Sequence, residues 1–340
     1  MRQCALPLAA RKNAADSVEG GILTQIAFPT PLVDGMLLLD KPVGITSNAA
    51  IQRVKRLFNA AKAGHVGTLD PLASGLLPVC LGEATKFSTG TFDADKSYDA
   101  EILLGVTTTT GDTEGEVTSR QSVAVSRGQV QAVLQRHTGA LAQTPPMYSA
   151  LKRDGKPLYA YARAGQTVAL TPRSITIHDI TLHDFAAERL RISVRCSKGT
   201  YIRVLAEDIG RALGCGATLA GLRRTAVGAF GLVGAVTLEQ LDALPATRRL
   251  ACLLPVDTLV SALPVMVLEA ELVRRMLTGQ TGRVEAGCAG LVRLYDHNRR
   301  FLGLGERQPD GRLMPKRLMA MPVAGPADGT GDRVQAPKIA

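Results

Sequence analysis

Tryptophan is absent from this chain of 340 residues, and aromatic side chains make up only 4% of it. Six cysteines are scattered along the sequence without a C-x-x-C pair, which excludes the common zinc-binding and thioredoxin-like motifs. A chain with 46% hydrophobic residues does not need a disulfide framework, so we expect reduced thiols and a cytoplasmic location. No apolar run approaches the roughly 20 residues of a membrane-spanning helix, and we expect no membrane attachment.

Acidic residues are in the minority, because 30 Asp and Glu stand against 40 Lys and Arg, for a formal net charge of +10. Such a surplus favours a polyanionic partner such as nucleic acid, since phosphate contacts release counterions. Between residues 143 and 165, Tyr159 and Tyr161 lie among lysines and arginines. This mixture is typical of surfaces that follow a nucleic-acid backbone and stack on bases. The alternatives are charge for solubility alone and an exposed insertion whose tyrosines merely pack.

One loop, residues 64–75, presents a lone carboxylate, that of Asp70, among small and apolar residues. The loop holds no second acid, and no cluster of metal ligands adjoins it. Pro71 biases the aspartate toward an extended, turn-like backbone, and the flanking glycines let other groups approach closely. A single acid in this setting favours nucleophilic or covalent chemistry over hydrolysis by two carboxylates. The alternative is a turn in which Asp70 caps a neighbouring backbone amide.

Apolar patterning predicts a chain with both helices and strands. Alternation of apolar and polar residues predicts strands at 98–104 and 190–196, and a helix of period 3.6 is expected after Ser47. A helix is also expected at 83–91, where the sequence follows an apolar run. From residue 264 to 323, short strand candidates separated by glycine and charged turns predict a small β-barrel-like domain.

Three motifs follow one another along the chain. The first is DGMLLLDKP at 34–42 with TSN at 46–48, the second is GHVGTLDPLASG at 64–75, and the third is CSKGTYIR at 196–203. Together they closely resemble the bacterial TruB family, the tRNA pseudouridine-55 synthases. The segments YSALK at 148–152 and LRR at 222–224 also resemble that family, and the resemblance covers roughly residues 34–323.

The resemblance implies an α+β fold, with a pseudouridine synthase catalytic domain on a mixed, largely antiparallel sheet plus a small C-terminal PUA-like β domain. We expect the catalytic domain at 34–252, with an RNA-facing insertion at about 143–165, and the PUA-like domain at 253–323. A flexible N-terminal extension at 1–33 and a disordered tail at 324–340 complete this interpretation.

The activity that the resemblance implies is the isomerisation of one uridine, position 55 in the T-loop of tRNA, to pseudouridine. The target base is flipped out, its N1–C1′ bond is broken, and C5 bonds to C1′ after the uracil has turned. The partner is then the T-arm of tRNA, the protein acts as a monomer, and no cofactor or metal takes part. The chain shows no phosphate-binding or dinucleotide motif that would contradict this expectation.

Three residues match catalytic positions of the family. Asp70 matches its catalytic aspartate, which must be ionised to act as a base or nucleophile. Arg203 matches the basic residue expected to partner that carboxylate. Tyr201 matches the tyrosine placed against the target base, whose phenol helps to remove the C5 proton or packs on the ring.

Substrate binding is assigned by the same resemblance to Tyr201 and to three further residues. Tyr98 matches a tyrosine that stacks on the flipped uracil, and such stacking contributes about 1–3 kcal/mol per base. Leu222 matches an apolar residue of the uracil pocket. His65 matches an RNA contact that helps to fill the space left by the flipped base.

Two other kinds of function compete with this interpretation. A non-catalytic tRNA-binding or RNA-folding protein would need the basic segment at 143–165 but not Asp70, Tyr98 and Tyr201 together. A nucleoside or glycoside hydrolase would need a second carboxylate to position water, and no motif supplies one. Relatives that depend on a guide RNA share the catalytic motifs, but the lack of a long basic extension favours the stand-alone form.

Overall fold

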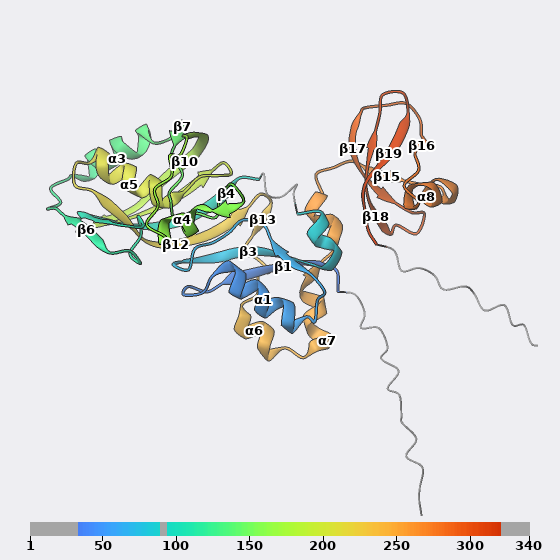
Figure 1. Ribbon diagram of the computed structural model, residues 1–340, viewed down its shortest axis with the longest axis horizontal. Helices are drawn as coiled ribbons and strands as arrows, with labels where there is room; N and C mark the ends of the chain where they lie inside the picture. The colour runs from blue at the N-terminus through green and yellow to red at the C-terminus, as the bar shows by residue number, and fades with distance from the viewer. Residues whose placement is uncertain (1–32, 89–93, 321–340) are drawn as a thin grey trace, which may run out of the picture. The chain divides into compact units, whose positions relative to one another are not determined.

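The computed structural model describes residues 33–88 and 94–320, and its strands form two larger β-sheets and two short hairpins (Figure 1). Apart from Val33, the predicted N-terminal extension lies outside the described residues, and so does the whole predicted tail at 324–340.

The larger sheet has ten strands. Eight follow in the order β14-β1-β3-β12-β4-β11-β10-β7, while β2 pairs with β3 and β13 with β12. Its pairs are antiparallel except for β3 with β12, which run parallel. The strands are β1 (Gly35–Lys41), β2 (Ala63–His65), β3 (Ala73–Leu81), β4 (Lys96–Leu104), β7 (Gly139–Gln143), β10 (Arg173–Ala186), β11 (Arg189–Cys196), β12 (Ala217–Val227), β13 (Phe230–Gly231) and β14 (Leu253–Leu254).

Strand β4 shows how the sequence produces this sheet. Successive side chains of a strand point to opposite faces, so an alternating sequence has one apolar face. Tyr98, Ala100 and Ile102 are buried on that face, whereas Asp99 is exposed. Burial of such side chains contributes roughly 25 cal/mol per Å² of apolar surface. The strand predicted at 98–104 is confirmed.

Helices pack against the apolar face of the sheet in two groups. Figure 1 shows α1 and α6 next to each other beside β1, and α3 and α5 near β10. Apolar residues of all four helices join one core cluster with residues of β1 and β4. Their bounds are α1 (Ser47–Leu57), α3 (Arg127–Arg136), α5 (Ile202–Ala212) and α6 (Leu238–Ala243). The helix predicted after Ser47 is confirmed, and the Thr46 side chain caps it by accepting from the Ala49 amide at 3.0 Å.

Several short elements connect or extend this domain. Two hairpins pair β5 with β6 and β8 with β9, and α4 follows the second hairpin. The elements are β5 (Val106–Thr108), β6 (Val117–Arg120), β8 (Lys152–Arg153), β9 (Lys156–Pro157), α4 (Leu158–Arg163), α7 (Ala246–Arg249) and the 3₁₀ helices η1 (Gly82–Lys86), η2 (Leu250–Cys252) and η3 (Val256–Val260).

The prediction of a helix at 83–91 is wrong for residues 83–88, the part of this range that the structure describes. The chain forms the short 3₁₀ helix η1 instead, which ends at Lys86 with Phe87 as its C-cap. The Phe87 amide donates to the Ala84 carbonyl, three residues back, at 3.0 Å. Bonds of this spacing give a tighter and less persistent helix than α-helical bonds do.

The C-terminal part forms a five-stranded sheet in the order β15-β17-β18-β19-β16. Its elements are β15 (Val265–Val267), α8 (Ala270–Leu277), β16 (Gly282–Arg283), β17 (Gly290–Tyr295), β18 (Phe301–Arg307) and β19 (Arg312–Leu318). Helix α8 was not predicted, since only strands were expected between 264 and 323, although Leu272, Val273, Met276 and Leu277 recur at helical spacing. The predicted α+β class, a largely antiparallel mixed sheet followed by a small β domain, is confirmed.

Contacts on both sides anchor the loop that carries Asp70. The Ser47 hydroxyl donates to the Leu69 carbonyl at 2.9 Å and accepts from the Leu69 amide at 2.8 Å. At the end of the loop, Gly75 has φ +99°, and a Cβ atom there would lie 2.3 Å from the Arg224 carbonyl oxygen. Only glycine allows β3 and β12 to approach so closely at this point. The loop is therefore tied to helix α1 before Asp70 and to the sheet after it.

Candidate active site

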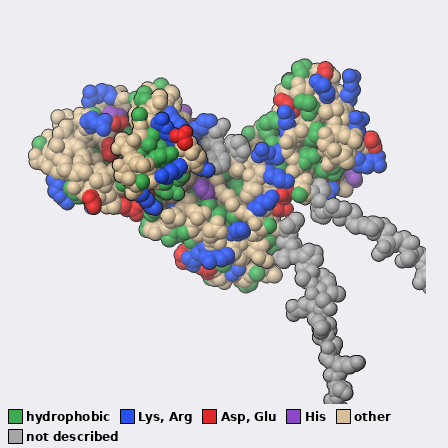
Figure 2. All heavy atoms as spheres, in the orientation of Figure 1, with side chains coloured by type: hydrophobic (Ala, Val, Ile, Leu, Met, Phe, Trp, Pro, Cys, Tyr) green, Lys and Arg blue, Asp and Glu red, His purple; other side chains and the backbone are tan. Residues whose placement is uncertain are grey.

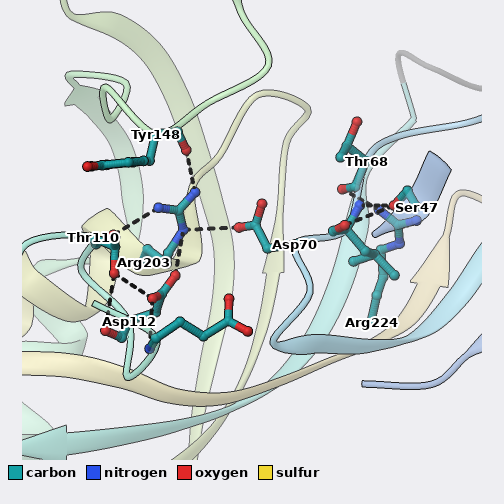
Figure 3. A network of polar contacts seen from close by, with 10 residues as sticks. Ser47, Thr68, Asp70, Thr110, Asp112, Tyr148, Arg203 and Arg224 are labelled. Atoms are coloured by element: carbon teal, nitrogen blue, oxygen red, sulfur yellow. Dashed lines mark hydrogen bonds and ion pairs between the residues drawn. The ribbon is translucent and has the colours of Figure 1, made fainter. Parts of the chain in front are cut away.

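Asp70 lies beside the guanidinium of Arg203 (Figure 3). Arg203 Nε donates to Asp70 Oδ2 at 3.0 Å. The Arg203 side chain is only 6% exposed, whereas that of Asp70 is 43% exposed. The carboxylate is thus open to a substrate on one side and bound to a buried cation on the other. The predicted partnership of these two residues is present in the structure.

Arg203 is held by two further segments of the chain. Its Nη1 donates to the Thr110 carbonyl at 2.8 Å and its Nη2 to the Tyr148 carbonyl at 2.7 Å. Arg203 is the second residue of α5, so the helix start, the loop after β5 and the segment before β8 meet at one side chain. Hydrogen bonds from a charged donor are stronger than neutral ones, and these fix the direction in which Nε meets Asp70.

A second carboxylate, that of Asp112, lies next to Arg203, and the sequence analysis missed it. Asp112 Oδ2 is 3.6 Å from Arg203 Nε, and its side chain is 6% exposed. The Thr110 hydroxyl donates to Asp112 Oδ1 at 2.6 Å, and the Glu114 amide donates to the same oxygen at 3.2 Å. The sequence showed only a polar loop rich in threonine and acids. The spacing of Thr110, Asp112 and Glu114 in the sequence gives no indication of a partner on α5.

Arg224 is buried beneath the Asp70 loop and supports its backbone. Its side chain donates to the Leu76 carbonyl at 2.7 Å and to the Gly67 carbonyl at 3.0 Å. Only 1% of Arg224 is exposed. In the sequence this arginine lies in the segment LRR at 222–224, and nothing there predicts its burial. An arginine side chain can be buried when backbone carbonyls accept hydrogen bonds from its N–H groups.

Lys41 is likewise buried. Its Nζ donates to the Pro42 carbonyl at 2.8 Å and to the Ile45 carbonyl at 2.7 Å. Burial lowers the pKa of Lys41 to about 8, and the nearby charge of Asp70 opposes that change only in part. Lys41 therefore stabilises the turn before α1 and adds positive charge close to Asp70.

Tyr98 and Leu222 lie on neighbouring strands near this loop. Tyr98 is 9% exposed and pairs in register with Arg224, while Leu222 lies opposite Ala100 and is half-buried. Burial raises the pKa of the Tyr98 phenol, and Arg224, which hydrogen-bonds to it, opposes that rise. Tyr98 is thus a core residue beside Arg224. Its stacking on a flipped base stays a prediction.

Tyr201 lies two residues before Arg203 in the chain, and His65 lies five residues before Asp70. Tyr201 precedes α5 by one residue and is half-buried, and burial raises the pKa of its phenol. His65 ends β2 and is also half-buried, and burial lowers the pKa of its imidazole. Within the described ranges, His65 Nδ1 is a buried atom without a hydrogen-bond partner. The roles of both residues toward RNA stay predictions.

The described part of the chain contains neither a metal-binding cluster nor a membrane-spanning helix. No group of three or more His, Cys, Asp or Glu residues in that part of the chain is arranged to hold a metal ion. None of the helices described there is long and apolar enough to cross a membrane.

Comparison with known proteins gives the family. Residues 55–202 match the N-terminal domain of TruB family pseudouridylate synthases. Residues 203–261 match the tRNA pseudouridylate synthase B C-terminal domain, and 264–319 match the C-terminal model of pseudouridine synthase II TruB. The protein named tRNA pseudouridine synthase B of Methylobacillus flagellatus is 54% identical over 84% of this chain and 95% of its own length. This chain belongs to the TruB family. It is therefore a pseudouridine synthase, and the resemblance drawn from its motifs is confirmed.

Another relative and two solved structures are also similar to this chain. The protein of the same name from Azoarcus sp. is 55% identical over 87% of this chain and 98% of its own length. Among solved structures, a Cbf5-Nop10-Gar1 complex is similar at 27% identity with a TM-score of 0.60, and it covers 82% of this chain and 79% of the other. An H/ACA RNP bound to a substrate RNA containing 2′-deoxyuridine is 25% identical with a TM-score of 0.62, covering 85% of both chains.

Proposed function

We propose that this TruB-family enzyme isomerises uridine 55 in the T-loop of tRNA, with Asp70 as its catalytic carboxylate. The observation that carries the proposal is the contact between a half-exposed carboxylate and a buried guanidinium, Asp70 with Arg203, at 3.0 Å. The relatives that match over most of the chain are named tRNA pseudouridine synthase B, which supports tRNA as the substrate.

The reaction breaks the N1–C1′ bond of the target nucleotide, turns the uracil, and joins C5 to C1′. The C5 proton leaves and N1 gains a proton, so the product is an isomer of the substrate. Asp70 acts as base or nucleophile at C1′, at uracil C6 or on a ribose proton, and each route needs an ionised carboxylate. Arg203 keeps Asp70 oriented, because two backbone carbonyls, those of Thr110 and Tyr148, fix its own guanidinium.

The base must leave the stack before Asp70 can reach it. Bases in a loop cost least to extrude, which suits a T-loop substrate. We assign Tyr98, Leu222, Tyr201 and His65 to the pocket that receives the uridine and to the space that it leaves. Tyr98 is 9% exposed, so this role requires its ring to become accessible to the base.

The test is tritium release from a T-arm transcript that carries C5-labelled uridine. Wild-type protein is expected to release tritium, whereas Asp70→Asn is expected to bind the same RNA and release none. The variant keeps the size of the side chain but removes the charge. Tritium release by Asp70→Asn at the wild-type rate would refute the assignment of Asp70. Free uracil among the products would favour a hydrolase instead.

The same assay separates the stand-alone enzyme from other possibilities. Activity on a bare T-arm transcript, with no further component, is expected, since the curated relatives at 54–55% identity carry the name of a tRNA enzyme. Tight binding of tRNA by wild-type protein without modification would favour an RNA-folding role. We also propose that the protein is a monomer in the cytoplasm, which light scattering and cell fractionation would test.

A further inference from the structure

Both backbone groups of Tyr201 are held by one side chain, that of Gln143. The Tyr201 amide donates to Gln143 Oε1 at 2.8 Å, and Gln143 Nε2 donates to the Tyr201 carbonyl at 3.1 Å. A primary amide can serve one N–H and one C=O in this way, as a neighbouring strand would. Gln143 ends β7 and is only 5% exposed, so the clamp is shielded from water. Tyr201 has no freedom to rotate its backbone without breaking these bonds.

Ser149 is the second polar residue beside Tyr201. It is 6% exposed, and in the described part of the chain its Oγ has no partner that meets hydrogen-bond geometry. Burial is the main influence on the Tyr201 phenol and raises its pKa, while the Ser149 hydroxyl is the leading group that lowers it. The two side chains therefore lie near each other, without a hydrogen bond of good geometry between them.

The segment that carries Ser149 is fixed at the active site by its backbone. The Tyr148 carbonyl accepts from Arg203 Nη2 at 2.7 Å, and the Ser149 carbonyl accepts from the Tyr159 amide at 3.1 Å. The Ser149 amide donates to the Met147 carbonyl at 3.0 Å. The hydroxyl thus has a defined position near Arg203 and Tyr201, which a flexible surface serine would not have.

We propose that Gln143 and Ser149 are positioning residues for Tyr201. Gln143 holds the backbone from which the phenol projects, and Ser149 takes up the phenol hydroxyl once a uridine lies against Asp70. This inference rests on the proposed function, because it requires Tyr201 to meet the target base. Hydrogen bonds in an active site are often long without substrate and tighten in the complex, which accounts for a buried hydroxyl with no partner. The bond would fix the rotation of the Tyr201 hydroxyl toward the base.

Ser149→Ala separates this role from a structural one. Removing a buried hydroxyl that has no partner does not remove a stabilising bond, so the variant is expected to unfold at or above the wild-type temperature. Its affinity for a T-arm transcript is expected to be unchanged, while kcat for tritium release falls about tenfold, since small misplacements at a reacting centre are costly. A wild-type kcat, or a loss of kcat that only follows a loss of folded protein, would overturn the proposal.

Tyr201→Phe shows whether Ser149 acts through the phenol. The double variant Ser149→Ala with Tyr201→Phe is expected to have the same kcat as Tyr201→Phe alone, because the hydroxyl that Ser149 positions is already missing. Losses that multiply in the double variant would overturn the proposal, since Ser149 would then act independently of Tyr201.

Gln143→Glu tests the backbone clamp. The carboxylate keeps the size of the side chain and its acceptor for the Tyr201 amide, but it places an oxygen opposite the Tyr201 carbonyl. We expect kcat to fall by about tenfold or more with tRNA affinity retained. Gln135→Glu, an exposed change on α3, is the control and should leave activity unchanged. Wild-type kcat for Gln143→Glu would overturn this half of the proposal.

Failure of this inference is distinguishable from failure of the proposed function. If wild-type protein releases tritium and Asp70→Asn does not, the proposed function stands, and wild-type kcat in both Ser149→Ala and Gln143→Glu defeats the inference alone. If wild-type protein releases no tritium, both are overturned.

Discussion

Arg203 donates from all three of its guanidinium nitrogens, to Asp70, Thr110 and Tyr148. Asp112 adds a buried negative charge at 3.6 Å, so the cation has two carboxylates within reach, one exposed and one enclosed. Burying a guanidinium costs a great deal of free energy unless its N–H groups are hydrogen-bonded and its charge is paired with a negative charge. The matching here keeps the arginine charged and leaves Asp70, the more exposed acid, available for chemistry.

Lys41 gives a test at the scale of one residue. Its pKa is lowered from 10.5 to about 8 in the folded protein, so between these values the folded state binds fewer protons than the unfolded state. The contribution of Lys41 to the free energy of unfolding therefore increases as pH rises through this window. Urea unfolding at several pH values should show wild-type protein gaining stability relative to Lys41→Met from about pH 8 to pH 10.5.

Lys62→Met provides the control for that measurement, because the Lys62 side chain is 63% exposed. Its difference from wild type should change little over the same pH range. A pH-independent difference between wild type and Lys41→Met would contradict the lowered pKa of Lys41.

At the scale of elements, the site depends on where strands and helices end rather than on their interiors. Asp70 follows β2, Arg203 begins α5, and Tyr201 lies at the junction between β11 and α5. The strand predicted at 190–196 is confirmed as part of β11, which ends at Cys196, shortly before Tyr201 and the start of α5. The element that carries Asp112 is a short hairpin loop, and apolar patterning gives no information about such a loop.

Gly75 gives a test at the scale of elements. Gly75→Ala would put a Cβ atom 2.3 Å from the Arg224 carbonyl oxygen, on a backbone with φ +99°. Strands β3 and β12 would have to separate, so we expect a loss of several kcal/mol of stability or no soluble protein. The measurement is the urea midpoint of the purified variant compared with wild type.

Gly128→Ala is the matched control for this change. Gly128 lies in α3, and a Cβ atom there meets nothing within 4 Å. Alanine in a helix is favoured over glycine by roughly 0.5–1 kcal/mol, so this variant should be more stable than wild type. Equal effects of the two substitutions would contradict the close approach of β3 and β12.

At the scale of the whole molecule, the formal net charge of +10 favours binding to a polyanion. Figure 2 shows Lys and Arg side chains spread over the visible face, with Asp and Glu less frequent among them. Exposed cations that contact phosphates release counterions on binding, and this release makes affinity depend on salt. Attraction of this kind is not specific for sequence, so selection of the uridine must come from the shape of the RNA and from the pocket.

A salt titration tests this view of the binding surface. Lys152 and Lys156 lie exposed on the β8–β9 hairpin. If both contact phosphates, the double change to Gln should lower the slope of log K against log[salt] by about 1–2. Arg136→Gln, an exposed change on α3, should leave the slope unchanged. An unchanged slope in the double variant would exclude this hairpin from the RNA interface.

The motifs of the sequence determined the family, and the resemblance to that family supplied the class of fold and the pairing of Asp70 with Arg203. Contiguous motifs suffice for the family, because local strings of residues set turns, helix starts and strand alternation. Only the tertiary structure revealed Asp112 beside Arg203, the burial of Arg224 and Lys41, and the clamp of Gln143 on Tyr201. A charged side chain is buried when backbone carbonyls from distant segments converge on it, and that convergence depends on strand order and register rather than on neighbouring residues in the chain.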